Sequence, residues 1–260
     1  MAGLHASSGA VSGNEPVPIV DLLGTSMSAL AHAIPVIASR TGREVIVIGG
    51  LAVVCRLTRP YRATGDLDTV DRRGTNETPQ LQLLLASGAE ASGVSGVLVP
   101  TTAGTVHVDV LEVTDADVAQ LSDDPNDRLH VLSHAWAAAT ATPVVLRARG
   151  TPDLTVAVAG PGPLVAMKLQ SIMNRGAAKE GTDLLDIIRV TLDPTAGPAA
   201  LSQLAAAGRQ LRRDASRHAT LWFNDRIKRS LDLVRAVPEG RDTQADDLHL
   251  VGELIQSALA

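Results

Sequence analysis

The sequence predicts an α/β (α+β) fold, in which a sheet with flanking helices comes first and a helical half follows. Short runs of β-branched residues alternate with helically spaced apolar residues as far as residue 160. After Gly160-Pro-Gly-Pro163 the pattern is helical, and 260 residues suffice for one large domain or two modest ones. We therefore expect a flexible N-terminus over 1–16, a sheet-centred core over 17–160 and a helical domain over 161–260.

The elements expected in the first part follow from local patterns. Ile19–Arg40 carries apolar residues at helical spacing, with a kink at Pro35. A buried strand over Glu44–Ile48 runs into Gly49-Gly50, and a helix over Leu51–Leu57 follows it. The remaining elements are a helix over Glu77–Gly88 and strands over Asp66–Val70, Gly96–Pro100, Thr105–Val113, Val144–Ala148 and Leu154–Ala159.

The second part is predicted to be helical throughout. Pro163 suits the first turn of a helix, and Leu164–Arg175 has helical spacing. Further helical segments are expected at residues 183–192, 198–213, 217–236 and 244–259.

Composition argues against several classes of protein. The net charge of −5 gives no general basic field, so overall charge does not indicate nucleic acid, although a local basic patch is compatible with it. The single cysteine, Cys55, excludes a disulfide framework and a cysteine-based zinc site, and its apolar neighbours favour a buried thiol. The apolar runs are too short to span a membrane and the first residues lack signal-peptide features, so we expect a cytoplasmic protein without membrane contact.

Three aspartates stand in strand contexts that need an explanation. Asp66 and Asp68 flank Leu67 on an expected strand, so both carboxylates point to one face while Leu67 points into the core. Asp109 shares one face of a later, otherwise apolar strand with His107. Neighbouring carboxylates repel each other unless a cation lies between them, and Mg²⁺ is the usual one. Three such groups can hold two metal ions roughly 3.5–4 Å apart, an arrangement suited to in-line phosphoryl displacement.

A turn with two glycines precedes these acids. Gly49-Gly50 follows a strand and opens a helix, so the backbone can approach a phosphate closely and the helix start offers free N–H groups. No Gly-Lys-Ser/Thr follows, which excludes a P-loop, and no third glycine completes a dinucleotide fingerprint. The turn is either a phosphate cradle or a tight turn without a ligand.

The order and spacing of these motifs match a known pattern. The chain reads Gly49-Gly50-Leu51-Ala52, then Arg62-Ala63-Thr64-Gly65-Asp66-Leu67-Asp68, and later Val108-Asp109-Val110. These motifs resemble the nucleotidyltransferase superfamily, and within it the AbiEii/MenT-like toxins of bacterial toxin–antitoxin pairs. The resemblance covers roughly Val45 to Arg189. It implies a nucleotidyltransferase-type mixed sheet, with 17–160 as the catalytic core.

The resemblance also implies functional residues in the helical part. The family places a lysine on the first helix after the sheet and an Asp-x-x-Asp further on, which Lys168 and Asp183-Leu-Leu-Asp186 match. Lys168, Ser171 and Arg175 fall on one helical stripe, so a cationic face toward a triphosphate is expected. The family usually has a basic residue directly before the first of these aspartates. Here Thr182 stands there and Lys179 lies a turn away, which leaves the roles of Lys179 and Asp186 open.

Several of these residues have a plainer interpretation. Asp183 could be the N-cap of a helix, with Asp186 at the third helical position, instead of or in addition to an active-site acid. Asp109 could pair with an arginine. Arg62 could pair with the aspartates, although we favour its steering a phosphate. Lys168 on an otherwise apolar helix favours phosphate binding, because an unpaired buried lysine is costly.

Two other groups are expected to lie at the surface. His130 and His134 are four residues apart and could share a metal, but no zinc-peptidase motif accompanies them. A basic run followed by aromatic residues could meet RNA, but it is more typical of a solvated helix face beside a core aromatic. Its members are Arg209, Arg212, Arg213, Arg217, His218, Trp222 and Phe223.

The motifs and the resemblance together predict a metal-dependent nucleotidyltransferase. It would transfer a nucleoside monophosphate from an NTP to a hydroxyl acceptor, with Asp66, Asp68 and Asp109 holding Mg²⁺ or Mn²⁺. Asp109 could also draw the proton from the acceptor, while Lys168 and Arg62 neutralise developing charge. The resemblance alone implies a toxin, tRNA as the acceptor, a catalytic Asp183 and a cognate antitoxin. The alternatives are a small-molecule nucleotidyltransferase, such as one that modifies an aminoglycoside, and a non-enzymatic nucleotide-binding module.

Overall fold

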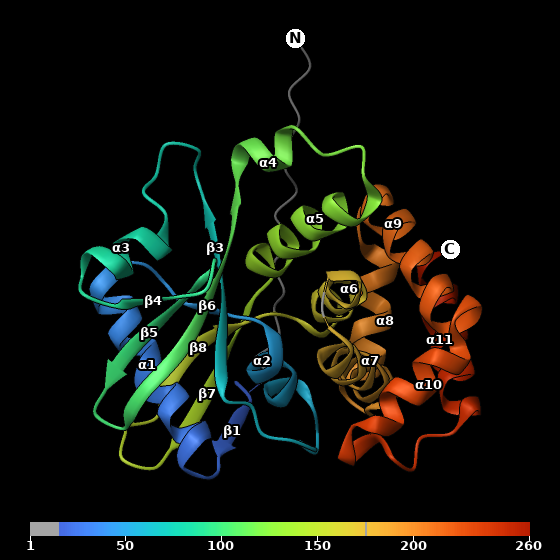
Figure 1. Cartoon of the computed structure of the whole chain (residues 1–260), viewed down its shortest axis with the longest axis horizontal. Helices are drawn as coiled ribbons and strands as arrows, with labels where there is room; N and C mark the ends of the chain where they lie inside the picture. Colours follow the sequence, from blue (N-terminus) through green and yellow to red (C-terminus); the bar gives the residue numbers. More distant parts are fainter. Residues whose placement is uncertain (1–15, 175) are drawn as a thin grey trace.

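Over residues 16–174 and 176–260, which a computed structural model describes, the chain forms an eight-stranded mixed sheet and a set of helices (Figure 1). The strands are β1 (Ile19–Leu22), β2 (Ile46–Val47), β3 (Asp66–Arg73), β4 (Glu90–Ser92), β5 (Gly96–Thr101), β6 (Gly104–Thr114), β7 (Thr142–Ala148) and β8 (Leu154–Val158). Their order in the sheet is β1-β7-β8-β2-β3-β6-β5-β4. The pairs β1–β7, β2–β8 and β3–β6 are parallel and the other neighbours antiparallel.

Helices cover both faces of the sheet. The first five are α1 (Thr25–Thr41), α2 (Gly49–Arg56), α3 (Gln80–Ala86), α4 (Asp115–Ala119) and α5 (Pro125–Ala139). In Figure 1, α1 and α3 lie on one side of the sheet, and α2 and α5 lie on the other, between the sheet and the later helices. The β2–α2 turn and the strands β3 and β6 therefore face the helical half.

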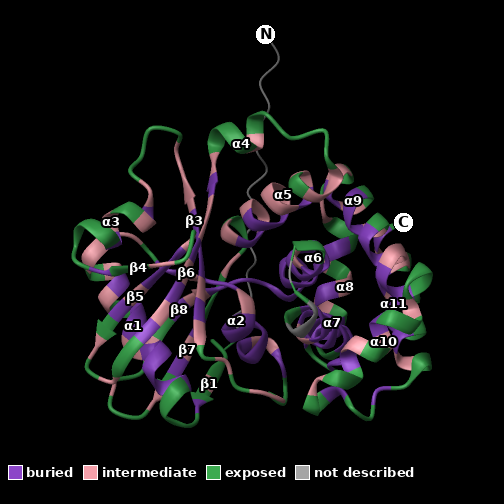
Figure 2. Ribbon diagram, viewed as in Figure 1, coloured by how far each residue is buried: buried purple, intermediate pink, exposed green. Residues whose placement is uncertain are grey.

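The helical half follows β8. Its elements are α6 (Pro161–Ser171), the 3₁₀ turn η1 (Ile172–Asn174), α7 (Ala177–Leu192), α8 (Ala196–Ala206), α9 (Arg209–Thr220), the π-helical η2 (Leu221–Asp225), α10 (Ile227–Ala236), the 3₁₀ turn η3 (Pro238–Gly240) and α11 (Ala245–Leu259). Every residue of α6 from Pro161 to Gln170 is buried, because α2, α5, α7 and α8 all pack against it (Figure 2). This central helix joins the two halves.

The predicted fold class is confirmed, with local corrections. The segment Ile19–Leu22 is an edge strand rather than the start of a helix, because it pairs with β7. Gly24, with a φ of 85°, separates it from α1. Pro35 lies inside α1. Residues 1–15 of the expected N-terminus lie outside the described residues, and the division at residue 160 stays a prediction. Among residues 16–174 and 176–260, none of the helices has the length and apolar character of a membrane span.

Alternation at Asp66-Leu67-Asp68 in β3 and at Val106–Val110 in β6 separates core from polar side chains as predicted. Leu67 and Val108 are fully buried. The arginines of the basic run in α9 lie at least partly in solvent beside the buried Trp222 and Phe223, as expected for a solvated helix face, whereas His218 of the same run is buried. Cys55 is buried as expected, and burial raises the pKa of its thiol to about 12.

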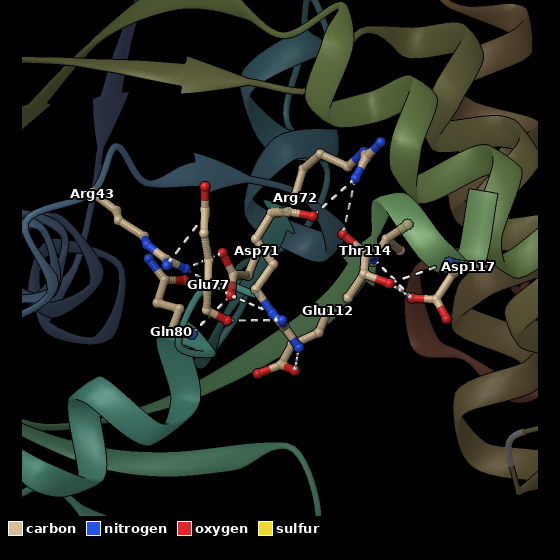
Figure 3. A network of polar contacts seen from close by, with 10 residues as sticks. Arg43, Asp71, Arg72, Glu77, Gln80, Glu112, Thr114 and Asp117 are labelled. Atoms are coloured by element: carbon tan, nitrogen blue, oxygen red, sulfur yellow. Dashed lines mark hydrogen bonds and ion pairs between the residues drawn. The ribbon is translucent and has the colours of Figure 1, made fainter. Parts of the chain in front are cut away.

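A polar network ties down the far end of β3 and β6, away from the Asp66 end (Figure 3). Asp71 is buried, accepts a 2.7 Å hydrogen bond from the backbone N–H of Gln80 and forms an ion pair with Arg43 at 2.9 Å. Arg73 pairs with Glu112 at 3.2 Å. These contacts anchor α3 and the strand ends, so these acids have structural partners.

Candidate active site

The Gly49-Gly50 turn joins β2 to α2 and lies against Asp68. Gly49 has a φ of 62°, in the left-handed region, and a Cβ there would overlap the Asp68 carboxylate. The Gly50 amide donates to Asp68 Oδ2 at 3.3 Å. Because both conformation and space exclude a side chain at Gly49, glycine is the residue that lets the backbone reach this carboxylate. The first N–H groups of α2 lie at the same turn, where a helix favours an anion.

Asp66, Asp68 and Asp109 lie on one face of two parallel strands. In the register of β3 and β6, Asp66 is opposite His107 and Asp68 is opposite Asp109. The His107 ring lies near Asp66 and Asp109, with its Nδ1 3.9 Å from Asp66 Oδ1 and 3.7 Å from Asp109 Oδ2. Ser95 donates to Asp109 Oδ1 at 3.4 Å. The three predicted aspartates therefore share one face of the sheet, and His107 lies on the same face beside two of them.

The acids supply oxygen ligands without closing a metal cage. Within residues 16–174 and 176–260, no three His, Cys, Asp or Glu side chains are grouped to hold one ion. Mg²⁺ keeps several waters and commonly binds one or two carboxylates together with substrate phosphates. The donor set therefore fits an ion held through Asp68 and a neighbouring acid and completed by substrate. The two-metal site stays a prediction.

A cavity of about 370 Å³ opens beside this turn, between the sheet and the helical half. It combines a carboxylate and glycine backbone from the sheet side with a cation, polar groups and apolar side chains from the helices. Its lining residues are Ile48, Gly49, Asp68, Ser95, Leu111, His130, His134, Leu164, Met167, Lys168, Gln170, Ser171 and Asn174. The structure therefore brings Gly49, Asp68 and Lys168 to one space, although they come from three distant parts of the sequence.

Lys168 belongs to a buried cluster of ion pairs, which we call the lysine cluster: Lys168, Arg62, Tyr61, Ser171, Asp183 and Asp186. Lys168 Nζ contacts Asp183, and it lies 2.7 Å from Asp186 Oδ2. Arg62 Nη2 lies 2.8 Å from the same Asp186 oxygen, and the Tyr61 hydroxyl donates to Asp186. Ser171 Oγ donates to Asp183 at 2.8 Å. The cluster holds Lys168 at the cavity wall.

Charge pairing outweighs burial in this cluster. Burial lowers the pKa of Lys168, but the carboxylates of Asp186 and Asp183 raise it by more than burial lowers it, so the net shift is upward. Burial raises the pKa of Asp186, but Lys168 and Arg62 outweigh it, so the net shift is downward. Both groups therefore stay charged at neutral pH.

The alternative of Asp183 as an N-cap is wrong. The helix α7 begins at Ala177 with Gly176 as its N-cap, so Asp183 lies well inside it and is buried. Gly181 lies inside this helix, and glycine is required there because α10 packs so closely that a Cβ would meet the Leu233 carbonyl. Asp183 thus enters the site as an ion-pair partner of Lys168.

The remaining predicted residues are placed as follows. Arg62 pairs with Asp186 of α7, and its phosphate-binding role stays a prediction. Lys179 is exposed in the first turn of α7, and its role stays open. Arg175, predicted on the stripe with Lys168, lies outside the described residues.

Several residues of the cavity wall were missed or misplaced by sequence reasoning. His134 was expected at the surface, but it is buried beneath His130, with ring centroids 4.2 Å apart. Burial and the neighbouring His130 lower the pKa of His134 to about 3, so its ring is neutral. Gln170 is buried at the cavity, and the polar residues Lys168 and Gln170 in an otherwise apolar helix were the available signal.

Comparisons with known proteins give a distant likeness. No protein-family model matches the chain, and no curated protein sequence does. Among solved structures, the chain is similar to an antigenic nucleotidyltransferase-like protein from Paracoccidioides brasiliensis, at 21% identity and a TM-score of 0.40. The match covers 72% of this chain and 91% of that chain.

Proposed function

We propose that this chain is a nucleotidyltransferase that moves a nucleoside monophosphate from an NTP to a hydroxyl acceptor. The observation that carries the proposal is the convergence of Gly49, Asp68 and Lys168 on one cavity. A triphosphate is bound by groups of these three kinds: a glycine backbone that admits a phosphate, a carboxylate that binds a metal ion, and a buried ammonium group.

The residues have separate roles in this reaction. The acceptor oxygen forms a bond to the α-phosphorus, the bond from that phosphorus to the bridging oxygen breaks, and pyrophosphate leaves. Asp109 takes the proton of the acceptor hydroxyl, and His107 and Ser95 hold its carboxylate in place. The Gly49-Gly50 backbone binds the phosphates, and Lys168 neutralises charge that develops on them. A bound Mg²⁺ or Mn²⁺, held by Asp66 and Asp68, would supply charge neutralisation and orient the triphosphate.

Arg62 and Asp183 act through residues that contact the substrate rather than by contacting it themselves. Arg62 approaches the turn closely enough that a Cβ at Gly50 would lie 3.1 Å from its Nη2. We assign it to fixing Asp186 and to the positive potential at the turn. Asp183 positions the ammonium group of Lys168, which it contacts directly.

The acceptor and the biological role are proposed from the motifs. The run from Gly49 to Asp68, together with Lys168 and the Asp183-Leu-Leu-Asp186 motif, resembles AbiEii/MenT-like toxins. This resemblance supports tRNA as the acceptor and a cognate antitoxin protein as a partner.

The test is transfer of label from each α-labelled NTP to total RNA, with Mg²⁺, Mn²⁺ or EDTA. The expected result is metal-dependent labelling of RNA in the tRNA size range and release of pyrophosphate. Asp66→Ala and Asp68→Ala are expected to abolish it, whereas Asp153→Ala, an exposed acid paired with Arg147, retains it. Labelling that survives both active-site changes would overturn the metal assignment.

The same assay separates the alternatives. Label on an added aminoglycoside instead of RNA indicates a small-molecule enzyme. NTP binding without pyrophosphate release indicates a non-enzymatic module.

A further inference from the structure

The cavity has a second polar edge on the opposite side of α6 from Lys168. Residues of an α-helix are about 100° apart, so Lys168 and Gln170 point to nearly opposite sides. Lys168 faces α7, where it pairs with Asp183 and Asp186. Gln170 faces α5, where its Nε2 donates to Asn126 Oδ1 at 3.4 Å. One wall of the cavity is therefore charged at the α7 edge and carries an amide at the α5 edge.

The α5 edge is uncharged but rich in hydrogen-bonding groups. Gln170 is 3% exposed, and a buried carboxamide is costly unless its two N–H groups and its oxygen find partners. The His130 ring lines the cavity together with Gln170, and Asn126 donates to Asn174 Oδ1 at 3.3 Å. Burial lowers the pKa values of both His130 and His134, so both rings are neutral. This edge offers neutral donors and acceptors, as the edge of a nucleobase does.

Apolar side chains lie between the two edges. On α6, Leu164 and Met167 occupy the helix face between Lys168 and Gln170, and Ile48 and Leu111 line the cavity from the sheet. A nucleotide presents the same kinds of surface in the same spatial order: charged phosphates, then the apolar faces of a planar base, then its neutral hydrogen-bonding edge. Ligand sites of this kind are mostly apolar, with a few polar groups that fix orientation.

We propose that the α5 edge of the cavity is the nucleobase site and that Gln170 is the residue that discriminates between bases. This inference rests on the proposed function, because it assumes that an NTP occupies the cavity. Asn126 holds the Gln170 carboxamide, and the remaining hydrogen-bonding capacity of the carboxamide is directed to the edge of the base. The opposing possibility is that Gln170 only ties α6 to α5.

The test measures dissociation constants for ATP, GTP, CTP, UTP and inorganic tripolyphosphate by calorimetry with Mg²⁺. Wild type is expected to prefer some bases by about tenfold, because a buried polar group left unpaired penalises the wrong base. Gln170→Leu is expected to bring the four NTPs within about twofold and to leave tripolyphosphate binding unchanged. Gln170→Glu, which keeps the shape and replaces an amide donor by an acceptor, is expected to reorder the four affinities.

The control is Gln203→Leu. Gln203 also holds α6, through a 2.8 Å hydrogen bond from the Gly162 amide to its Oε1, but it does not line the cavity. Its substitution is expected to lower stability without changing the base preference. Base preferences unchanged in both Gln170 variants, or an equal loss of tripolyphosphate binding, would overturn this inference alone. Failure of wild type to bind any NTP would overturn the proposed function, and this inference with it.

Discussion

Replacing Asp186 by asparagine is expected to destabilise the fold strongly. Asp186 is fully buried, lies 2.7 Å from Lys168 Nζ and 2.8 Å from Arg62 Nη2, and accepts from the Tyr61 hydroxyl. With asparagine at this position, Lys168 and Arg62 would lose the negative charge with which both are paired. Removing one partner of a buried ion pair costs about 3–5 kcal/mol, and because the amide oxygen still accepts, we expect the lower end, about 3 kcal/mol.

The matched control is the same substitution in an exposed pair. Asp153 lies 3.0 Å from Arg147, but the two side chains are 57% and 48% exposed, so Asp153→Asn is expected to cost less than about 1 kcal/mol. Urea unfolding followed by circular dichroism measures both variants. A loss of about 3 kcal/mol corresponds to a fall in Tm of about 6–12 °C for a chain of this size.

The pH dependence gives an independent check on the same carboxylate. Lys168 and Arg62 outweigh burial and hold the pKa of Asp186 below its usual value. Its stabilisation is therefore fully present above the unfolded pKa of about 4 and is lost as pH falls through the lower folded value. The gap between wild type and Asp186→Asn should narrow below about pH 4. If Asp186→Asn costs no more than Asp153→Asn at pH 7, the ionic cluster is not a stabilising unit and the reasoning is refuted.

Two further predictions concern the cavity wall. Burial lowers the pKa of His134 to about 3, whereas the unfolded chain takes up this proton near pH 6.5, so lowering the pH favours unfolding. Between pH 6.5 and 5, wild type should lose about 2 kcal/mol more stability than His134→Gln in urea unfolding, and parallel losses would contradict this. Gly49→Ala should cost about 1–2 kcal/mol and abolish NTP binding, because its Cβ displaces the Asp68 carboxylate. Gly65→Ala, where a Cβ meets nothing within 4 Å, is its control, and equal effects in calorimetry would exclude this role for the turn.

Local sequence sufficed where one strand or one turn determined the outcome. The alternation of Asp66, Leu67 and Asp68 predicted which side chains face the site, because a strand has a period of two residues. The edge strand at Ile19 could not be predicted in the same way. It exists only through pairing with Val145, more than a hundred residues later, and its own residues suit a helix equally well.

The helical half shows a second limit of sequence reasoning. The pattern identified Lys168 as unusual but not its partners, since Asp183 and Asp186 meet it only when α6 packs on α7. The spacing of Asp183 and Asp186 left a helix start at Asp183 open. In the fold, Gly181 is instead the point where α10 packs against the middle of α7. Tertiary packing here overrides a local signal.

The charges around the cavity explain why a cation belongs to the proposed reaction. In the lysine cluster, Lys168 and Arg62 contact Asp183 and Asp186, and these carboxylates lower the positive potential that the two cations present to an incoming triphosphate. The row of Asp66, Asp68 and Asp109 on the sheet side is negative. A free triphosphate would therefore meet repulsion from the sheet and only weak attraction from the helices. Backbone N–H groups at Gly49-Gly50 offset part of this repulsion, and a divalent cation bound at the acids would cancel most of their negative charge. On the proposed function, the substrate is the metal complex of an NTP rather than the free anion, and Lys168 serves to orient it and to stabilise the transition state.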